Sequence, residues 1–257
     1  MPTALIVDDE PEANELLAML VQLKGYETVS AFNGREALDQ VDRVRPELVF
    51  LDLMLPDING YEVCRQLKSH RATCAIPIVM VTARLATENR IQGFRMGATD
   101  YVPKPYTPEQ IFDAMAGTEI WRTGLDQSKS GGTVLLDTRS EVNNLRAIST
   151  LWTVLLQRTS LSEDAARELD HVLVELATRA TDWGHRNGVG PVASLDYQWN
   201  SEGVMFTLRD HSGWFTAESS RGLEGPRAIV ARAPFQESVR NERHDDVVFT
   251  LHFSPRS

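Results

Sequence analysis

The sequence contains few cysteines and no long apolar run. Its 257 residues include two cysteines, Cys64 and Cys74, which are too few for a disulfide framework and favour small buried thiols in a reducing cytosol. No stretch reaches the roughly 18 consecutive apolar residues of a transmembrane helix. The N-terminus has no basic segment before its short apolar run, so it does not resemble a signal peptide. We therefore expect a cytoplasmic protein without a membrane segment.

Positive charge is also scarce. The net charge is −10 at pH 7, and residues 125–257 contain one lysine, Lys129. A DNA-binding module needs a basic surface to face the phosphates. We therefore expect no DNA binding, and we expect the second half of the chain to act on a protein partner. The length fits two domains of ordinary size.

The first 120 residues alternate between two patterns. Apolar runs predict buried parallel strands at 4–7, 48–51 and 77–82, with weaker strands at 27–30 and 100–102. Helical periodicity follows each strand, at 12–24, 34–44, 60–68, 87–96 and 108–116. Five strands alternating with five helices predict an α/β fold with a doubly wound, five-stranded parallel sheet. The ligand site of such a sheet lies at the carboxyl ends of its strands.

The remainder of the chain is organised differently. Small, polar and glycine residues predict a flexible linker at 123–132, between domains at 1–122 and 133–257. Beyond it, we expect strands at 133–137, 192–199, 204–210 and 247–253, and helices at 141–158, 163–185 and near 226–232. This mixture predicts an α+β two-layer sandwich.

Polar side chains follow several strands of the first domain. Asp8 and Asp9 come after the first strand, and Asp52 ends the third. Three carboxylates at one sheet edge would suit Mg²⁺, a hard cation that keeps water as its other ligands. Thr82 ends the fourth strand and Lys104 follows the fifth. A hydroxyl and an ammonium at that edge would hold the oxygens of a phosphoryl group.

Four segments carry a family resemblance. They are LIVDDE at 5–10, LVFLDLMLPDINGYEV at 48–63, IVMVTA at 78–83 and GATDYVPKPY at 97–106. They closely resemble the receiver domain of response regulators, which has a flavodoxin-like fold. The resemblance implies that Asp52 is the phospho-acceptor. It also implies that Asp9 and Asp52 ligate Mg²⁺ by side chain and Met54 by its backbone carbonyl, with Asp8 supporting the metal.

The same resemblance assigns further roles. Thr82 and Lys104 would bind the phosphoryl oxygens, and Tyr101 would be the aromatic switch residue that turns inward on phosphorylation. Gly60 fits a turn beside the site, and Pro105 fits a cis-proline after the lysine. The phosphoryl group would come from a cognate histidine kinase.

The second domain leaves two interpretations open. In HVLVELATRATDWG at 171–184 and LRDHSGWF at 208–215, Glu175, Asp210 and Gly213 form a nucleotide site, or they are a surface acid, a strand-end cap and a turn residue. His171 and Glu175, four residues apart on one helix, suggest a phospho-accepting histidine with its base, two metal ligands or a surface hydrogen bond. The order of elements over 132–253 resembles the GHKL ATPase fold of histidine kinases, and in particular the anti-sigma-factor serine kinases. That resemblance implies that Glu175 is the catalytic base and that Asp210 reads adenine.

The resemblance has three departures at the nucleotide site. Arg179 stands where that family has a Mg²⁺-binding asparagine, and an arginine has no acceptor for a metal. Ser212 and Trp214 stand where glycines allow the backbone to approach the nucleotide. We therefore predict a degenerate domain that does not bind ATP, is not an enzyme and serves as a binding surface. Nucleotide binding without Mg²⁺, through Arg179, stays open.

These features predict a two-component response regulator whose output is phosphorylation-dependent protein binding. The resemblance implies a sigma factor, an anti-sigma factor or an anti-sigma-factor antagonist as the partner. The alternative is an active ATP-dependent serine kinase controlled by the receiver. The sequence leaves homodimerisation open.

Overall fold

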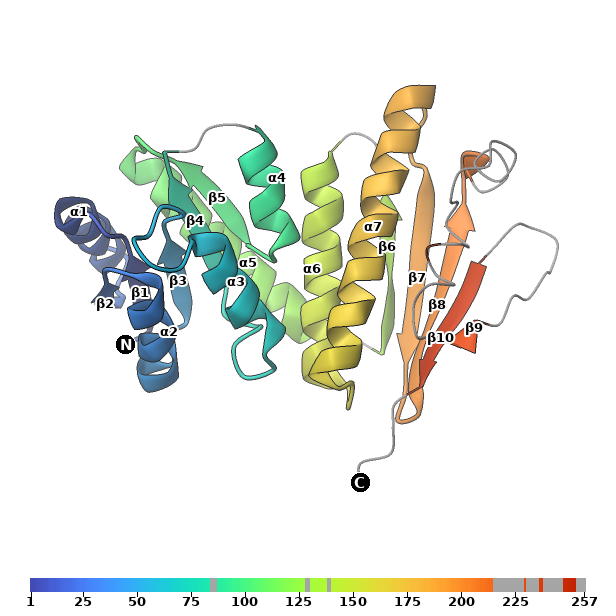
Figure 1. Ribbon diagram of the computed structural model, residues 1–257, viewed down its shortest axis with the longest axis horizontal. Helices are drawn as coiled ribbons and strands as arrows, with labels where there is room; N and C mark the ends of the chain where they lie inside the picture. The colour runs from blue at the N-terminus through green and yellow to red at the C-terminus, as the bar shows by residue number, and fades with distance from the viewer. Residues whose placement is uncertain are drawn as a thin grey trace. The chain divides into compact units, whose positions relative to one another are not determined.

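The chain forms two compact units, which are described separately. The computed structural model describes residues 1–83, 87–127, 130–137, 140–214, 229, 236–237 and 247–252. The units are Met1–Asp126 and Gln127–Ser257, and Figure 1 labels their helices and strands. Within the described ranges, no helix is long and apolar enough to cross a membrane.

The first unit is built on a five-stranded parallel sheet with the order β2-β1-β3-β4-β5. Its strands are β1 (Thr3–Val7), β2 (Glu27–Ala31), β3 (Leu48–Leu51), β4 (Ile78–Thr82) and β5 (Asp100–Pro103). Its helices are α1 (Pro11–Gln22), α2 (Gly34–Val44), α3 (Gly60–Ser69), α4 (Thr87–Arg95) and α5 (Pro108–Gln127). The predicted five-stranded parallel fold is confirmed.

Side chains alternate between the two faces of this sheet. Ala4 and Ile6 join a core cluster that includes residues of α1 and α5. Leu5 and Val7 join a second cluster that includes residues of α2 and α3. Because successive strand residues point to opposite faces, a strand that is apolar throughout must be covered by helices on both sides.

Helix α5 is longer than the sequence pattern predicts. Ile111, Ala114 and Met115 pack into the first core cluster, and the apolar periodicity of the sequence ends there. The helix nevertheless continues to Gln127. It therefore runs through the first part of the segment expected to be a linker.

The second unit has an antiparallel five-stranded sheet with the order β6-β7-β8-β10-β9. Its strands are β6 (Gly131–Leu136), β7 (Ala193–Trp199), β8 (Gly203–Asp210), β9 (Gln236–Glu237) and β10 (Val247–His252). Helices α6 (Glu141–Arg158) and α7 (Glu163–Asn187) contact each other and β6. In Figure 1 both helices lie on one side of the sheet. The two-residue strand β9 was not predicted, and the helix expected near 226–232 lies outside the described residues except for Ile229.

Candidate phosphorylation and metal site

Three carboxylates meet at the carboxyl edge of the first sheet. Asp8 and Asp9 follow β1, and Asp52 follows β3. One oxygen of each lies within 4.8 Å of the others. Asp8 and Asp52 are buried, with 2% and 6% of their surface exposed, whereas Asp9 is exposed. The parallel topology explains this arrangement, since neighbouring parallel strands end at the same edge.

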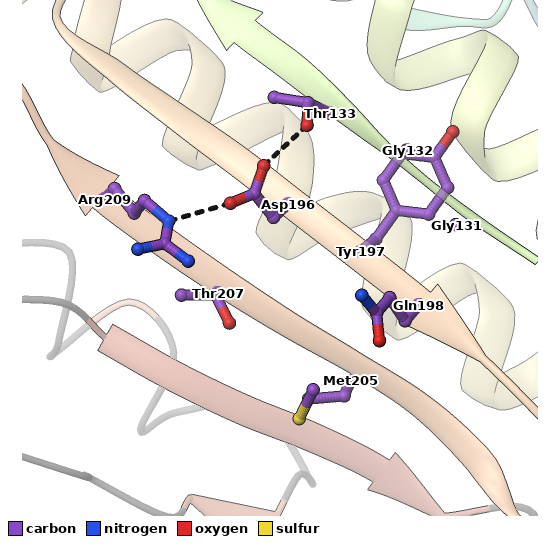
Figure 2. A pocket seen from close by; sticks show the side chains of 9 residues that line it. All are labelled: Gly131, Gly132, Thr133, Asp196, Tyr197, Gln198, Met205, Thr207 and Arg209. Carbon is purple, nitrogen blue, oxygen red and sulfur yellow. Dashed lines mark hydrogen bonds and ion pairs between the residues drawn. The ribbon is translucent and has the colours of Figure 1, made fainter.

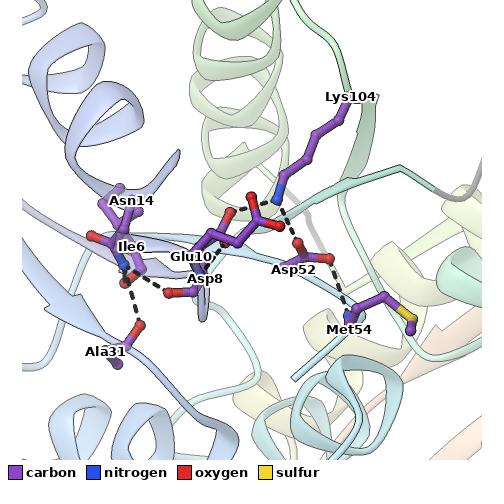
Figure 3. Close-up of polar contacts among 8 residues, drawn as sticks. All are labelled: Ile6, Asp8, Glu10, Asn14, Ala31, Asp52, Met54 and Lys104. Atoms are coloured by element: carbon purple, nitrogen blue, oxygen red, sulfur yellow. Dashed lines mark hydrogen bonds and ion pairs between the residues drawn. The ribbon is translucent and has the colours of Figure 1, made fainter. Parts of the chain in front are cut away.

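Lys104 joins the two buried acids. Its Nζ lies 2.6 Å from Asp8 Oδ2 and 2.5 Å from Asp52 Oδ2. Dashed lines mark these contacts in Figure 3. Burial alone would lower the pKa of Lys104, but its hydrogen bonds to Asp52 and Asp8 raise that pKa above its usual value. Burial raises the pKa of Asp8, and Lys104 only partly opposes this effect. The ammonium therefore compensates two acids that would otherwise repel each other.

Backbone groups also orient these carboxylates. The N–H of Glu10 donates to Asp8 Oδ1, and the N–H of Met54 donates to Asp52 Oδ1, each at 3.1 Å. Helix α1 begins just after Glu10, so its positive N-terminal end lies beside the acidic cluster. The second oxygen of each acid is the one that faces Lys104.

Asn14 supports the site, and the sequence analysis did not identify it. Its side chain is buried on α1, and its Nδ2 donates to the carbonyls of Ile6, Asp8 and Ala31 at 3.2 to 3.3 Å (Figure 3). These bonds fix the turn that carries the acids between β1 and α1. The available signal was an amide at a buried position of a helical stripe, where a polar side chain must find partners.

Gly60 lies against the end of β3. A Cβ at this position would overlap the carbonyl oxygen of Asp52 and lie 2.9 Å from the Cα of Leu53. The Gly60 N–H donates to the Leu53 carbonyl at 3.1 Å. Only glycine allows this approach, so Gly60 sets the position of the loop beside Asp52.

The other predicted receiver residues lie around the same edge. Thr82 is fully buried at the end of β4, and its carbonyl accepts a hydrogen bond from the Lys104 N–H at 2.8 Å. Tyr101, on β5, is half-buried against the second core cluster. The Lys104–Pro105 peptide bond is cis.

The donor set fits a magnesium ion. Three carboxylates lie within reach of one another, and they are the oxygen ligands that this hard cation prefers. The exposed Asp9 leaves a side of the cluster open to water, which Mg²⁺ keeps in its coordination sphere. Mg²⁺ and Lys104 would then share the neutralisation of the same buried acids.

Comparison with known proteins identifies the family. The model for the response regulator receiver domain matches residues 4–116. The sensory transduction protein RegX3 of Mycobacterium tuberculosis is 33% identical over 202 residues, which cover 76% of this chain and 86% of that protein. The chain belongs to the response regulators.

Other response regulators match a smaller part. PhoB of Pseudomonas aeruginosa, a phosphate regulon transcriptional regulatory protein, is 38% identical over 52% of this chain and 60% of its own length. MtrA of Mycolicibacterium smegmatis is 44% identical over 42% of this chain and 46% of its own length. The chain thus spans about half the length of these curated relatives. A solved structure of a putative response regulator from Chloroflexus aurantiacus is 36% identical, covering 46% of this chain and 98% of that one with a TM-score of 0.45.

These relatives contradict the expectation that this response regulator binds no DNA. MtrA is named a DNA-binding response regulator, and RpaA of Synechocystis a DNA-binding dual master transcriptional regulator. The expectation was wrong because it rested on net charge and on the scarcity of lysine in the second half. DNA binding depends on the local placement of basic side chains, and the second half carries nearly all of its positive charge as arginine.

In the second unit, Glu175 and Arg179 lie one turn apart on α7. Glu175 Oε1 is 3.8 Å from the guanidinium of Arg179, and both side chains are about 40% exposed. The arginine that replaces the expected asparagine thus lies beside the residue expected to be a base. His171, on the same helix, is exposed.

The loop after β8 is held by hydrogen bonds to Asp210 at its start and to Trp183 of α7. Asp210 Oδ1 accepts the N–H of Ser212 at 2.8 Å, and Ser212 Oγ accepts the indole N–H of Trp183 at 3.1 Å. Gly213 has a φ of 75°, a conformation that favours glycine. Trp214 is fully buried. The carboxylate expected to read adenine therefore holds its own loop.

A hollow of about 420 Å³ lies elsewhere, on the sheet of the second unit. Figure 2 shows Asp196 between two of its lining residues, accepting hydrogen bonds from Thr133 at 2.6 Å and Arg209 at 2.8 Å. Residues of β6, β7 and β8 line it, and they do not include Glu175, Arg179, Asp210 or Gly213.

Proposed function

We propose that this response regulator is a two-component switch phosphorylated on Asp52 by a histidine kinase. The observation that carries the proposal is the buried Asp52 carboxylate, 2.5 Å from Lys104 and grouped with Asp8 and Asp9. The phosphoryl group leaves a phosphohistidine nitrogen of the kinase, the P–N bond breaks, and a P–O bond forms to Asp52. Hydrolysis by water later returns a free carboxylate and inorganic phosphate.

Different residues of this chain would bind the metal ion and the phosphoryl group. Asp9, Asp52 and the Met54 carbonyl would hold Mg²⁺, with Asp8 supporting it, and the bound ion would neutralise charge on the transferring group. Lys104 would exchange its bond to Asp52 for one to a phosphoryl oxygen. Thr82 would hold another oxygen, and Tyr101 would turn inward as Thr82 moves.

The test is labelling with a small phospho-donor. Acetyl phosphate with Mg²⁺ should convert the full-length chain to an acyl phosphate, visible as a mobility shift in a phosphate-affinity gel and lost on treatment with hydroxylamine. Asp52→Asn should not react, whereas Asp39→Asn, which removes an exposed acid on α2, should. Labelling of Asp52→Asn at the wild-type rate would reject the assignment.

We propose that the second unit is a degenerate GHKL-like domain whose binding of a protein partner depends on phosphorylation, with a sigma factor, an anti-sigma factor or an antagonist as that partner. Two helices on an antiparallel sheet support the likeness. The Glu175–Arg179 proximity and the self-bonded Asp210 loop support the loss of nucleotide chemistry. Capture of a purified partner should differ between wild type, Asp52→Asn and the mimic Asp52→Glu. Equal capture by all three would contradict it.

Two other functions of the second unit, a serine kinase and DNA binding, have tests of their own. Retention of Glu175 and Asp210 favours an active serine kinase. If ATP with Mg²⁺ binds at micromolar concentration and Asp210→Ala abolishes that binding, the second unit has a working nucleotide site and our proposal of a degenerate domain is wrong.

The names of MtrA and RpaA favour DNA as a second candidate ligand. Binding of duplex DNA that strengthens on phosphorylation and weakens with salt would establish it.

A further inference from the structure

The last part of α5 lies beyond the region that matches the receiver family. That match ends at residue 116, whereas the helix continues to Gln127. The extra 11 residues, 117–127, form about three helical turns. We call them the α5 extension. Along the chain they lead up to the second unit, which begins at Gln127.

Lys68 holds the extension from the side of α3. Its Nζ donates to the carbonyls of Cys74 and Ile76 at 2.9 and 2.8 Å, and it lies 4.6 Å from the ring centroid of Trp121. This is the geometry of a cation–π contact. Burial lowers the pKa of Lys68 to about 8, so the ammonium form still dominates at neutral pH.

A second contact holds the extension from the side of α1. The hydroxyl of Tyr26, a member of the first core cluster, donates to Glu119 Oε1 at 3.1 Å. Burial and this acid together raise the pKa of Tyr26 to about 12. Arg122 and Glu47 form a further ion pair at 3.0 Å, but this pair is exposed and contributes little to stability. The α5 extension is therefore held by contacts from both faces of the sheet.

All of these contacts lie at the edge opposite the phosphorylation site. Tyr26, Glu47 and Ile76 shortly precede β2, β3 and β4, whereas Asp52 follows the end of β3. The side-chain stem of Lys68 also lies against Gly97, where a Cβ would come within 2.9 Å of it. Gly97 belongs to the loop between α4 and β5, and β5 carries Tyr101. Lys68 thus touches both a loop next to the expected switch and the helix that leads to the output.

We propose that the Lys68–Trp121 contact is a latch that fastens the α5 extension to the receiver and that the fastened helix transmits the state of Asp52 to the second unit. The latch itself is a structural claim about the unphosphorylated chain. The transmission rests on the proposed function, namely on phosphorylation of Asp52.

Amide hydrogen exchange of the full-length chain tests the latch. Trp121→Leu removes the ring and replaces it with a better helix former, so a loss of helix propensity cannot explain faster exchange. We expect exchange in 117–127 to rise about tenfold, the effect of losing a partly buried cation–π contact. Lys68→Met should act in the same direction. The control Ile120→Leu changes a neighbouring side chain that is 74% exposed and should exchange as wild type does. Wild-type exchange in both latch variants would overturn the proposal.

The same variants test transmission. Acetyl phosphate and Mg²⁺ should change exchange in α6 of the wild type, and this change should disappear in Trp121→Leu at equal phosphorylation of Asp52. If the change persists at full size although 117–127 exchange faster, the transmission claim is wrong and the latch stands. If the wild type cannot be phosphorylated, the proposed function fails, and the unphosphorylated measurements still decide the latch.

Discussion

Among single residues, Lys104 determines the charge balance of the acidic site. It lies within 2.6 Å of both Asp8 and Asp52, and its side chain is 18% exposed. Breaking a buried ion pair leaves an uncompensated charge, which costs more than the pair itself contributes. Lys104 therefore matters for stability as well as for phosphoryl binding.

We predict that Lys104→Met destabilises the first unit by about 3 kcal/mol without Mg²⁺, because two buried acids lose their cation. Saturating Mg²⁺ should remove most of this deficit, since the ion neutralises the same carboxylates. Urea unfolding with and without Mg²⁺ measures both values. Lys104→Arg keeps the charge and is the control. An equal deficit in both conditions would show that Mg²⁺ does not replace the lysine.

Asp8 gives the site a pH dependence. Burial raises its pKa above the usual 3.8, against the opposing effect of Lys104, so protons compete with Mg²⁺ at higher pH than at an ordinary aspartate. In the window between 3.8 and the raised pKa the folded state binds more protons than the unfolded state. Without metal, stability therefore falls as pH rises through this window.

We predict that Mg²⁺ affinity, measured by calorimetry, declines on acidification before ordinary aspartates titrate. Asp8→Asn should weaken binding overall and flatten this decline. The same pH profile in wild type and Asp8→Asn would assign the decline to another group.

At the scale of elements, the loop between β3 and α3 is fastened on both sides. Asp57 accepts the backbone N–H groups of Gly34 and Arg35 at 2.7 and 3.0 Å, which ties the loop to the start of α2. Burial alone would raise the pKa of Asp57, but backbone hydrogen bonds, first from Ile58 and then from Arg35 and Gly34, lower it below the usual value. Gly60 packs the other end of the loop against Asp52. The loop beside the phospho-acceptor is thereby held in place.

We predict opposite effects for two glycine-to-alanine changes. Gly60→Ala should destabilise the chain by about 3 kcal/mol, because the methyl group collides with backbone that cannot move aside. Gly124→Ala, in α5, meets no atom within 4 Å and should stabilise the helix by up to about 1 kcal/mol. Urea unfolding of both variants compares them. A loss of stability in Gly124→Ala would mean that this turn of α5 needs glycine.

At the scale of the whole molecule, the acidic cluster belongs to one unit alone. Asp8, Asp9 and Asp52 all lie in Met1–Asp126. A ligand that binds only the folded form of one unit stabilises that unit by mass action. Tryptophan fluorescence can separate the units, because Trp121 is the first of the five tryptophans and the other four lie in the second unit.

We predict that Mg²⁺ stabilises the first unit selectively. In a Trp121→Phe variant, fluorescence reports only the second unit, so Mg²⁺ at 100 times its dissociation constant should leave the fluorescence transition in place. The same Mg²⁺ should stabilise the first unit by about 2.7 kcal/mol, seen by circular dichroism. The Asp9→Asn variant should lose this gain. Movement of both transitions together would show that the units unfold as one.

The sequence determined the first unit almost completely. Its strands are apolar on both faces, as at Leu5 and Ile6, and this pattern admits a parallel sheet covered by helices on both sides. In such a sheet the residues that follow the strand ends lie at the same edge. The positions of Asp8, Asp52 and Lys104 after strands therefore sufficed to place them together. In the second half, the chain order predicted a helical layer and strands β6, β7, β8 and β10. It did not predict β9, a two-residue strand too short to show an alternating pattern.

Only the tertiary structure decided which polar side chains support the site and where α5 ends. Asn14 shows no motif, and its role depends on three carbonyls from two segments, the end of β1 and the end of β2. Residues 117–127 have no apolar stripe, and the contacts of Trp121 and Glu119 with distant residues hold them. Local sequence encodes periodicity and strand-end chemistry because these depend on neighbours along the chain. Contacts such as Lys68–Trp121 depend on the packing of segments far apart in sequence, so they become visible only once the chain is folded.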